Sequence, residues 1–259
     1  MRYITLKKST LLKIGAGIIA LIAVVGVTFS AAGTESASTQ KKKLPIYCTS
    51  KTEKIASLSF DAAWGNEDTN TLIEILGKYN VKATFFVVGE WVDKYPESVK
   101  ALSDAGHEIQ NHSDTHPHMP KLSIEDMTKQ LNSCNDKIEK LTGKRPVLFR
   151  APYGDYDNTM LDTVRSLGMY TIQWDVDSLD WKDLSAADIK TRVLSRVKPG
   201  SIVLFHNAAK NTPEALPGII ESLITDGYKL IPISENISKD NYTVDHEGRQ
   251  ISSPTDIKS

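Results

Sequence analysis

Short apolar runs alternate with helical patterns along the middle of this 259-residue chain, and no other feature restricts the fold as much. Apolar runs predict strands at 54–60, 83–88, 107–110, 147–149, 170–175, 201–205 and 229–233. Segments with helical periodicity predict helices at 67–79, 91–105, 123–142, 157–167, 185–197 and 213–226. Strands that alternate with helices form a mostly parallel sheet with helical crossovers. The sequence therefore predicts a single α/β domain, built as a barrel or as an open sheet.

The ends of several predicted helices have recognisable signals. Ser123 and Ser185 stand three residues before Asp126 and Asp188, which is the spacing of an N-terminal cap. A glycine follows each of four helical runs, as expected where a helix ends in a left-handed residue. These glycines are Gly106, Gly143, Gly168 and Gly227.

Polar side chains stand directly after the predicted strands. The carboxyl ends of parallel strands lie on one side of a sheet or barrel, where α/β proteins form their sites. We therefore expect these side chains to converge. They are Asp61 after 54–60, His112 after 107–110, Arg150 after 147–149, Asp177 and Asp180 after 170–175, and His206 after 201–205.

The run NHSDTHPH at 111–118 indicates a metal site. It places His112 and His116 four residues apart, a spacing that puts both imidazoles on one face of a helical turn. Neutral imidazoles are ligands for divalent metals such as zinc. We therefore predict that His112 and His116 bind a metal.

Five ordered motifs together resemble the NodB-type polysaccharide deacetylases, a carbohydrate esterase family with a distorted (β/α) barrel. The resemblance covers about residues 52–237, and the first motif is similar to that of the spore-associated branch of Gram-positive bacteria. It implies removal of acetyl groups from a sugar polymer with one divalent metal, zinc first and cobalt or manganese as alternatives. The motifs are SFDAAWG at 59–65, NHSDTHPH, RAPYGDY at 150–156, DVDSLDW at 175–181 and LFHN at 204–207.

The resemblance also implies roles for individual residues. His112 and His116 match metal ligands, Asp61 the general base and His206 the general acid. The other matched positions support these groups or the substrate. They are Arg150, which orients the base, Asp180, which tunes the acid, Tyr153, whose backbone N–H binds the oxyanion, and Trp181 and Leu204, which line the acetyl pocket.

One position departs from the family pattern. The family has a second aspartate after the base as a third metal ligand, and this chain has Ala62 there. The site then holds metal weakly, recruits His118 or a repositioned Asp61, or holds none.

Three functions follow from these motifs. The first is a metal-dependent deacetylase acting on N-acetyl groups of a cell-wall polysaccharide, peptidoglycan or a related polymer. The second is a weak or inactive deacetylase-like protein that binds glycan at the cell surface or spore. The third is an O-acetyl esterase that uses the same residues.

The N-terminus predicts a location outside the cytoplasm. Four basic residues precede or enter a mostly apolar run that ends at Ala32, so residues 1–32 are predicted to be a signal peptide or a retained membrane anchor. Residues 33–51 are predicted to be a linker and 238–259 a polar, loosely ordered tail.

Charge and cysteine content restrict the partners. The net charge is −1, or −5 without residues 1–32, which gives no case for nucleic acid binding. We expect a monomer whose partner is the glycan, with membrane contact only through an uncleaved N-terminus. Cys48 and Cys134 could form one disulfide in an oxidising compartment, but their positions favour two free thiols.

Overall fold

The computed structural model describes residues 41–253, so the predicted signal or anchor at 1–32 lies outside the described residues. The strands are β1 (Cys48–Thr49), β2 (Ile55–Ala62), β3 (Thr84–Val87), β4 (Glu108–Asn111), β5 (Leu148–Phe149), β6 (Tyr170–Thr171), β7 (Val176–Asp177), β8 (Ser201–His206), β9 (Lys229–Leu230), β10 (Tyr242–Val244) and β11 (Arg249–Ser252). The α-helices are α2 (Thr69–Lys78), α3 (Gly89–Lys94), α4 (Pro96–Asp104), α5 (Ile124–Thr142), α6 (Asn158–Ser166), α7 (Ala186–Leu194), α8 (Thr212–Thr225) and α9 (Ile233–Asn236). Short 3₁₀ turns lie at η1 (Met119–Lys121), η2 (Pro152–Gly154) and η3 (Asp180–Lys182).

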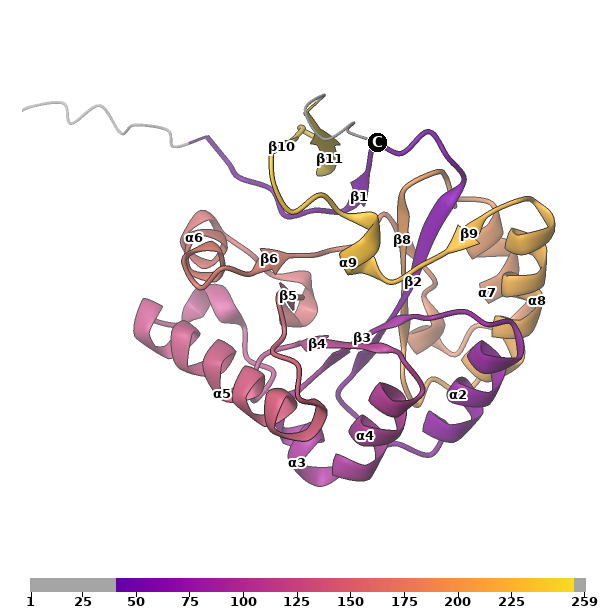
Figure 1. Ribbon diagram of the computed structural model, residues 1–259, viewed down its shortest axis with the longest axis horizontal. Helices are drawn as coiled ribbons and strands as arrows, with labels where there is room; N and C mark the ends of the chain where they lie inside the picture. Colours follow the sequence, from indigo (N-terminus) through magenta and orange to yellow (C-terminus); the bar gives the residue numbers. More distant parts are fainter. Residues whose placement is uncertain (1–40, 254–259) are drawn as a thin grey trace, which may run out of the picture. The chain divides into compact units, whose positions relative to one another are not determined.

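The strands form a curled, mostly parallel sheet. The central order is β8-β2-β3-β4-β5-β6, and the neighbours in this series pair in parallel. The segment after β6 returns to β8, because β7 pairs with β8 and Ile172 forms a parallel bridge with Ile46. The sheet therefore curls into a distorted barrel with helices around its outside (Figure 1), which confirms the predicted α/β fold.

The two faces of β2 have different partners. Leu58, Phe60 and Ala62 belong to the largest apolar cluster, together with buried residues of α2 and α8. Ser59 and Asp61 alternate with them and contact Arg150 instead. Side chains alternate between the faces of a strand, so this pattern places Asp61 inside the barrel and Ala62 toward the helical layer.

The predicted cap signals are confirmed. The hydroxyls of Ser123 and Ser185 accept hydrogen bonds from the backbone N–H groups of Asp126 and Asp188. The four glycines after helical runs have left-handed backbone. Within the described residues 41–253, no helix is both long enough and apolar enough to cross a membrane. Cys48 and Cys134 are free, as predicted.

Two predicted elements are divided in the structure. The helix predicted at 91–105 is two helices, α3 and α4, because Pro96 lacks an N–H and begins a new helix. The strand predicted at 170–175 is reduced to β6 and resumes only at β7.

The prediction that the two flanking segments lie outside the folded domain is wrong for parts of both. Residues 45–49 of the predicted linker join the fold, because Ile46 is buried and β1 pairs with β8 and β11. In the predicted loose tail, β10 and β11 form an antiparallel hairpin. The buried Gln250 amide exchanges hydrogen bonds with the backbone of Ser238, so polar pairing orders a segment that has few apolar residues.

Candidate active site

The ends of separate strands bring the predicted polar residues together. Asp61 lies near the end of β2, His112 directly after β4, and Arg150 directly after β5. His206 is the last residue of β8, and Asp61 pairs with it across the sheet. The predicted convergence at the carboxyl ends of the strands is confirmed.

Asp61 and Arg150 form a buried ion pair. Arg150 Nη1 lies 2.7 Å from Asp61 Oδ1, and Arg150 Nη2 donates to Ser59 Oγ at 2.9 Å and to the Gln173 carbonyl at 3.2 Å. Arg150 is completely buried. Burial alone would raise the pKa of Asp61, but Arg150 and the neighbouring imidazoles outweigh it and lower this pKa. Asp61 is therefore held as a carboxylate, the form that accepts a proton.

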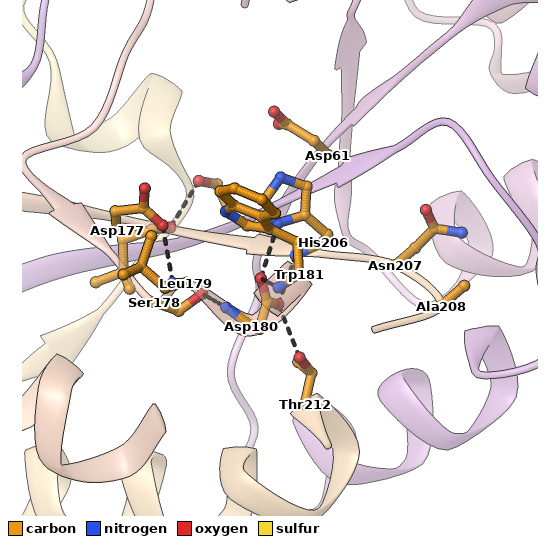
Figure 2. A network of polar contacts seen from close by, with 12 residues as sticks. Asp61, Asp177, Ser178, Leu179, Asp180, Trp181, His206, Asn207, Ala208 and Thr212 are labelled. Atoms are coloured by element: carbon orange, nitrogen blue, oxygen red, sulfur yellow. Dashed lines mark hydrogen bonds and ion pairs between the residues drawn. The ribbon is translucent and has the colours of Figure 1, made fainter. Parts of the chain in front are cut away.

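The buried Asp180 and the partly buried His206 form a second pair (Figure 2). Asp180 Oδ1 lies 2.8 Å from His206 Nδ1, and Asp180 Oδ2 accepts hydrogen bonds from the His206 backbone and from Thr212 Oγ1. Burial by itself would lower the pKa of His206, but the Asp180 carboxylate outweighs burial and raises it. The arrangement favours an imidazolium, which is the form that donates a proton.

His112 and His116 lie close together, but not on a helical turn as the spacing predicted. Ser113 and His116 have positive φ angles of 68° and 58°, so residues 112–116 form a loop. The two rings are 5.0 Å apart between centroids. His112 Nδ1 is engaged by the Arg150 carbonyl at 2.8 Å, which leaves Nε2 directed toward Asp61 Oδ2 at 3.6 Å.

Helix α5 holds this histidine loop in place. Gln130 Oε1 accepts hydrogen bonds from the backbone N–H groups of Asp114 and Thr115, each at 2.9 Å. Lys137 Nζ lies 2.6 Å from Asp114 Oδ1 and 2.7 Å from Asp93 Oδ2. A loop with left-handed residues needs such anchors, because side chains make that backbone unfavourable.

The residues present supply only part of a metal-ligand set. Ala62 offers no donor, and His118 Nδ1 is bound to Asp155 at 2.5 Å, with its ring stacked on Tyr153. Within residues 41–253, no three His, Cys, Asp or Glu side chains are grouped so that they could hold a metal ion. Neither His118 nor Asp61 therefore completes the set that His112 and His116 begin.

The predicted substrate-binding residues border the same site. Tyr153 has a φ of 61° in η2, and its ring lies 4.6 Å from that of His116. Trp181 is more than half exposed and follows Asp180 in η3. Leu204 is buried on β8, where it pairs with Ser59 and Asp177.

Sequence reasoning missed three residues of the site. Thr212 completes the hydrogen bonding of Asp180. Asn207 follows His206 in the LFHN motif, and Trp64 stands three residues after Asp61 in the SFDAAWG motif. The Trp64 ring is 6.2 Å from the rings of both His116 and His206. The sequence signal that could have identified Asn207 and Trp64 was their place within these two motifs.

Comparison with known proteins agrees with this geometry. A family model described as polysaccharide deacetylase matches residues 49–172. The peptidoglycan-N-acetylmuramic acid deacetylase PdaA of Bacillus subtilis is 32% identical over 79% of this chain and 79% of its own length. The crystal structure of a CE4 family pseudoenzyme from Bacillus anthracis is 37% identical, with a TM-score of 0.73 over 75% of this chain and 69% of that one.

These matches, together with the fold and the strand-end site, show that the chain belongs to the polysaccharide deacetylase family. The deacetylase PdaC of Bacillus subtilis is 36% identical over 71% of this chain, which spans only 38% of that protein's length. The chain also spans 60% of an uncharacterized relative from the same organism.

Proposed function

We propose that this chain acts outside the cytoplasm on an N-acetylated cell-wall polysaccharide of the peptidoglycan type, and that its reaction is removal of N-acetyl groups. The observation that carries the proposal is the presence of two charged pairs, Asp61–Arg150 and Asp180–His206, whose members Asp61 and His206 lie opposite each other on the neighbouring strands β2 and β8. Relatives named as peptidoglycan deacetylases support the substrate class.

The two pairs suit the two proton transfers of amide hydrolysis. Asp61, kept ionised by Arg150, takes a proton from the attacking water. His206, kept protonated by Asp180, gives a proton to the departing amine nitrogen. The backbone N–H of Tyr153 stabilises the oxyanion that forms between these transfers.

The predicted metal site has an incomplete set of ligands in the described part of the chain. A divalent ion, zinc first and cobalt or manganese as alternatives, lowers the pKa of water and polarises a carbonyl when bound. Here His112 and His116 provide two imidazoles, and the described residues provide no third ligand. The two proton transfers are therefore assigned to Asp61 and His206, and we expect low metal affinity to limit the rate.

A second candidate function is glycan binding without turnover. Ala62 favours it, because it removes the carboxylate that the family uses as a ligand. The likeness to a pseudoenzyme also favours it, and a mutant of that pseudoenzyme with restored enzymatic activity is a further structural match at 38% identity.

Acetate release tests the first function. The purified chain is incubated with peptidoglycan fragments and chitooligosaccharides, with added Zn²⁺, Co²⁺ or Mn²⁺, beside an aryl acetate that reports O-acetyl esterase activity. Release from the glycan above that of Asp61→Asn supports the deacetylase. Folded protein that releases none with any metal overturns it, and hydrolysis of the aryl acetate alone favours the esterase.

Substitution at position 62 separates the enzyme from the binding protein. Ala62→Asp is compared with Ala62→Asn, which has similar size and no charge, by metal content and acetate release. Metal binding and activity that appear only in Ala62→Asp favour a glycan-binding role for the unmodified chain. Bound metal with turnover in the unmodified chain rejects that role.

A further inference from the structure

The exposed aromatic side chains of the described region all belong to the site. Within residues 41–253, Trp64, Tyr153 and Trp181 are the aromatic residues among the exposed large hydrophobic side chains. Each comes from a segment that also carries a site residue: 59–65, 150–156 or 175–181. Exposed apolar groups that gather at one place indicate a binding surface, whereas scattered ones do not.

Among these three residues, Trp64 lies near two histidines of the site. The residue is 56% exposed. The ring lies 6.2 Å from His116, of the predicted metal pair, and 6.2 Å from His206, the proposed acid. A ligand that reaches both histidines therefore passes within contact distance of this indole.

The backbone of Trp64, rather than its ring, is fixed by hydrogen bonds. The carbonyls of Trp64 and Gly65 each accept from the amide of Asn207, at 3.0 and 2.6 Å, and from the indole N–H of Trp91, at 2.6 and 2.7 Å. Asn207 also accepts from the Ala63 backbone at 3.2 Å. Both anchoring side chains are buried, with Asn207 4% and Trp91 3% exposed.

This construction keeps a large apolar ring in solvent. Leaving a tryptophan more than half exposed forgoes part of the stabilisation that burial of its apolar surface would give. The anchors prevent the segment from folding inward to recover it. Because the backbone of this segment is already fixed, a ligand that covers the ring needs to order only the Trp64 side chain.

We propose that Trp64 is a sugar-stacking residue, which places one N-acetylhexosamine ring of the glycan between His116 and His206. The inference rests on the proposed glycan substrate and adds a residue that binds it. The C–H face of a pyranose ring is apolar, so it can cover the indole while its hydroxyl and acetamido groups remain available to the polar side chains.

The test is direct binding, which does not require turnover. Affinity for chitopentaose and for a peptidoglycan tetrasaccharide is measured by calorimetry on the full chain and on Trp64→Ala, Trp64→Phe and Ile224→Ala. Ile224 is the control, because it is an exposed apolar residue on α8. Trp64→Ala should not alter the fold, because the anchors bind the backbone, and circular dichroism checks this.

We expect Trp64→Ala to weaken binding about tenfold or more, as removal of a central aromatic contact does. Trp64→Phe should retain affinity within about threefold, because a ring remains, and Ile224→Ala should bind as the unmodified chain does. Trp91→Phe removes one anchor and should give an intermediate loss.

The measurements distinguish failure of the stacking role from failure of the proposed glycan substrate. If the unmodified chain binds a probe and Trp64→Ala binds it equally well, the stacking role is wrong and the proposed substrate stands. If the unmodified chain binds neither probe, the proposed glycan substrate fails, and the stacking role fails with it.

Discussion

Removal of one partner from the Asp61–Arg150 pair should destabilise the fold strongly. Asp61 and Arg150 are 6% and 0% exposed, and their charged atoms are 2.7 Å apart. Arg150→Met leaves a buried carboxylate without its cation, which costs about 3–5 kcal/mol. Asp61→Leu leaves a buried guanidinium unpaired and should cost a similar amount.

The double variant, Asp61→Leu with Arg150→Met, should lose less unfolding free energy than the sum of the two single variants. With both charges gone, the remaining losses are the hydrogen bonds from Arg150 to Ser59 and to the Gln173 carbonyl. Each such loss costs about 1–3 kcal/mol. The two single costs sum to about 6–10 kcal/mol, whereas the double variant should cost about 2–6 kcal/mol. We therefore expect the double variant to be about 4 kcal/mol more stable than additivity predicts, and this difference is the coupling energy of the pair.

Urea unfolding measures all three costs from the midpoint and the slope. The control is Arg145→Met, because Arg145 makes exposed ion pairs with Asp136 and Glu139 and should contribute less than about 1 kcal/mol. Additivity within about 0.5 kcal/mol would show that the two charges do not stabilise one another, and it would refute the reasoning from burial.

Three further predictions concern residues that support the site or the fold. Burial lowers the pKa of His107 to about 4, so the unfolded chain binds more protons between about pH 4 and 6.5. The contribution of His107 to stability should be complete above pH 6.5 and fall by up to about 3 kcal/mol toward pH 4, in urea titrations across pH. Burial also lowers the pKa of His116 to about 4, so His107→Asn should remove only the part of the slope that comes from His107. Gln130→Ala removes the acceptor of the Asp114 and Thr115 N–H groups, which water can partly replace, and should cost about 0.5–1.5 kcal/mol by urea unfolding, while the exposed neighbour Lys129→Ala should change stability by less than about 0.5 kcal/mol. Gln250→Ala removes both hydrogen bonds to Ser238 and should cost about 1–3 kcal/mol in thermal unfolding; an unchanged midpoint would show that the C-terminal hairpin does not stabilise the barrel.

The main strands and helices could be predicted because their periodicity is local. Successive side chains of the run KIASLSF point to opposite faces of β2. Ser123 and Ser185 cap their helices through hydrogen bonds to residues only three positions later in the sequence. The C-terminal hairpin escaped prediction because β11 pairs with β1, whose residues lie about two hundred positions earlier in the chain. Few apolar side chains mark such a segment, so composition predicted a loose tail.

The candidate site was predictable as a set of residues but not as a geometry. Asp61, Arg150, Asp180 and His206 converge because parallel strands end on one side, a rule that needs only strand order. The conformation of the His112–His116 loop depends on anchors from α5, which spacing does not reveal. Trp64 was missed because its position is set by backbone carbonyls that accept from Asn207 and Trp91.

The alternation of β2 explains how one part of the site can weaken while the other remains intact. Ala62 lies in the apolar cluster with Leu58 and Phe60, whereas Asp61 faces Arg150. A carboxylate at position 62 would be buried among apolar groups unless a bound metal drew it toward the histidines. Ala62→Asp should therefore be less stable than the unmodified chain without metal and should regain stability with zinc, by RT ln(1 + [metal]/Kd). A stability that zinc leaves unchanged in Ala62→Asp would contradict this, and it would mean that restoring the carboxylate alone does not rebuild the metal site.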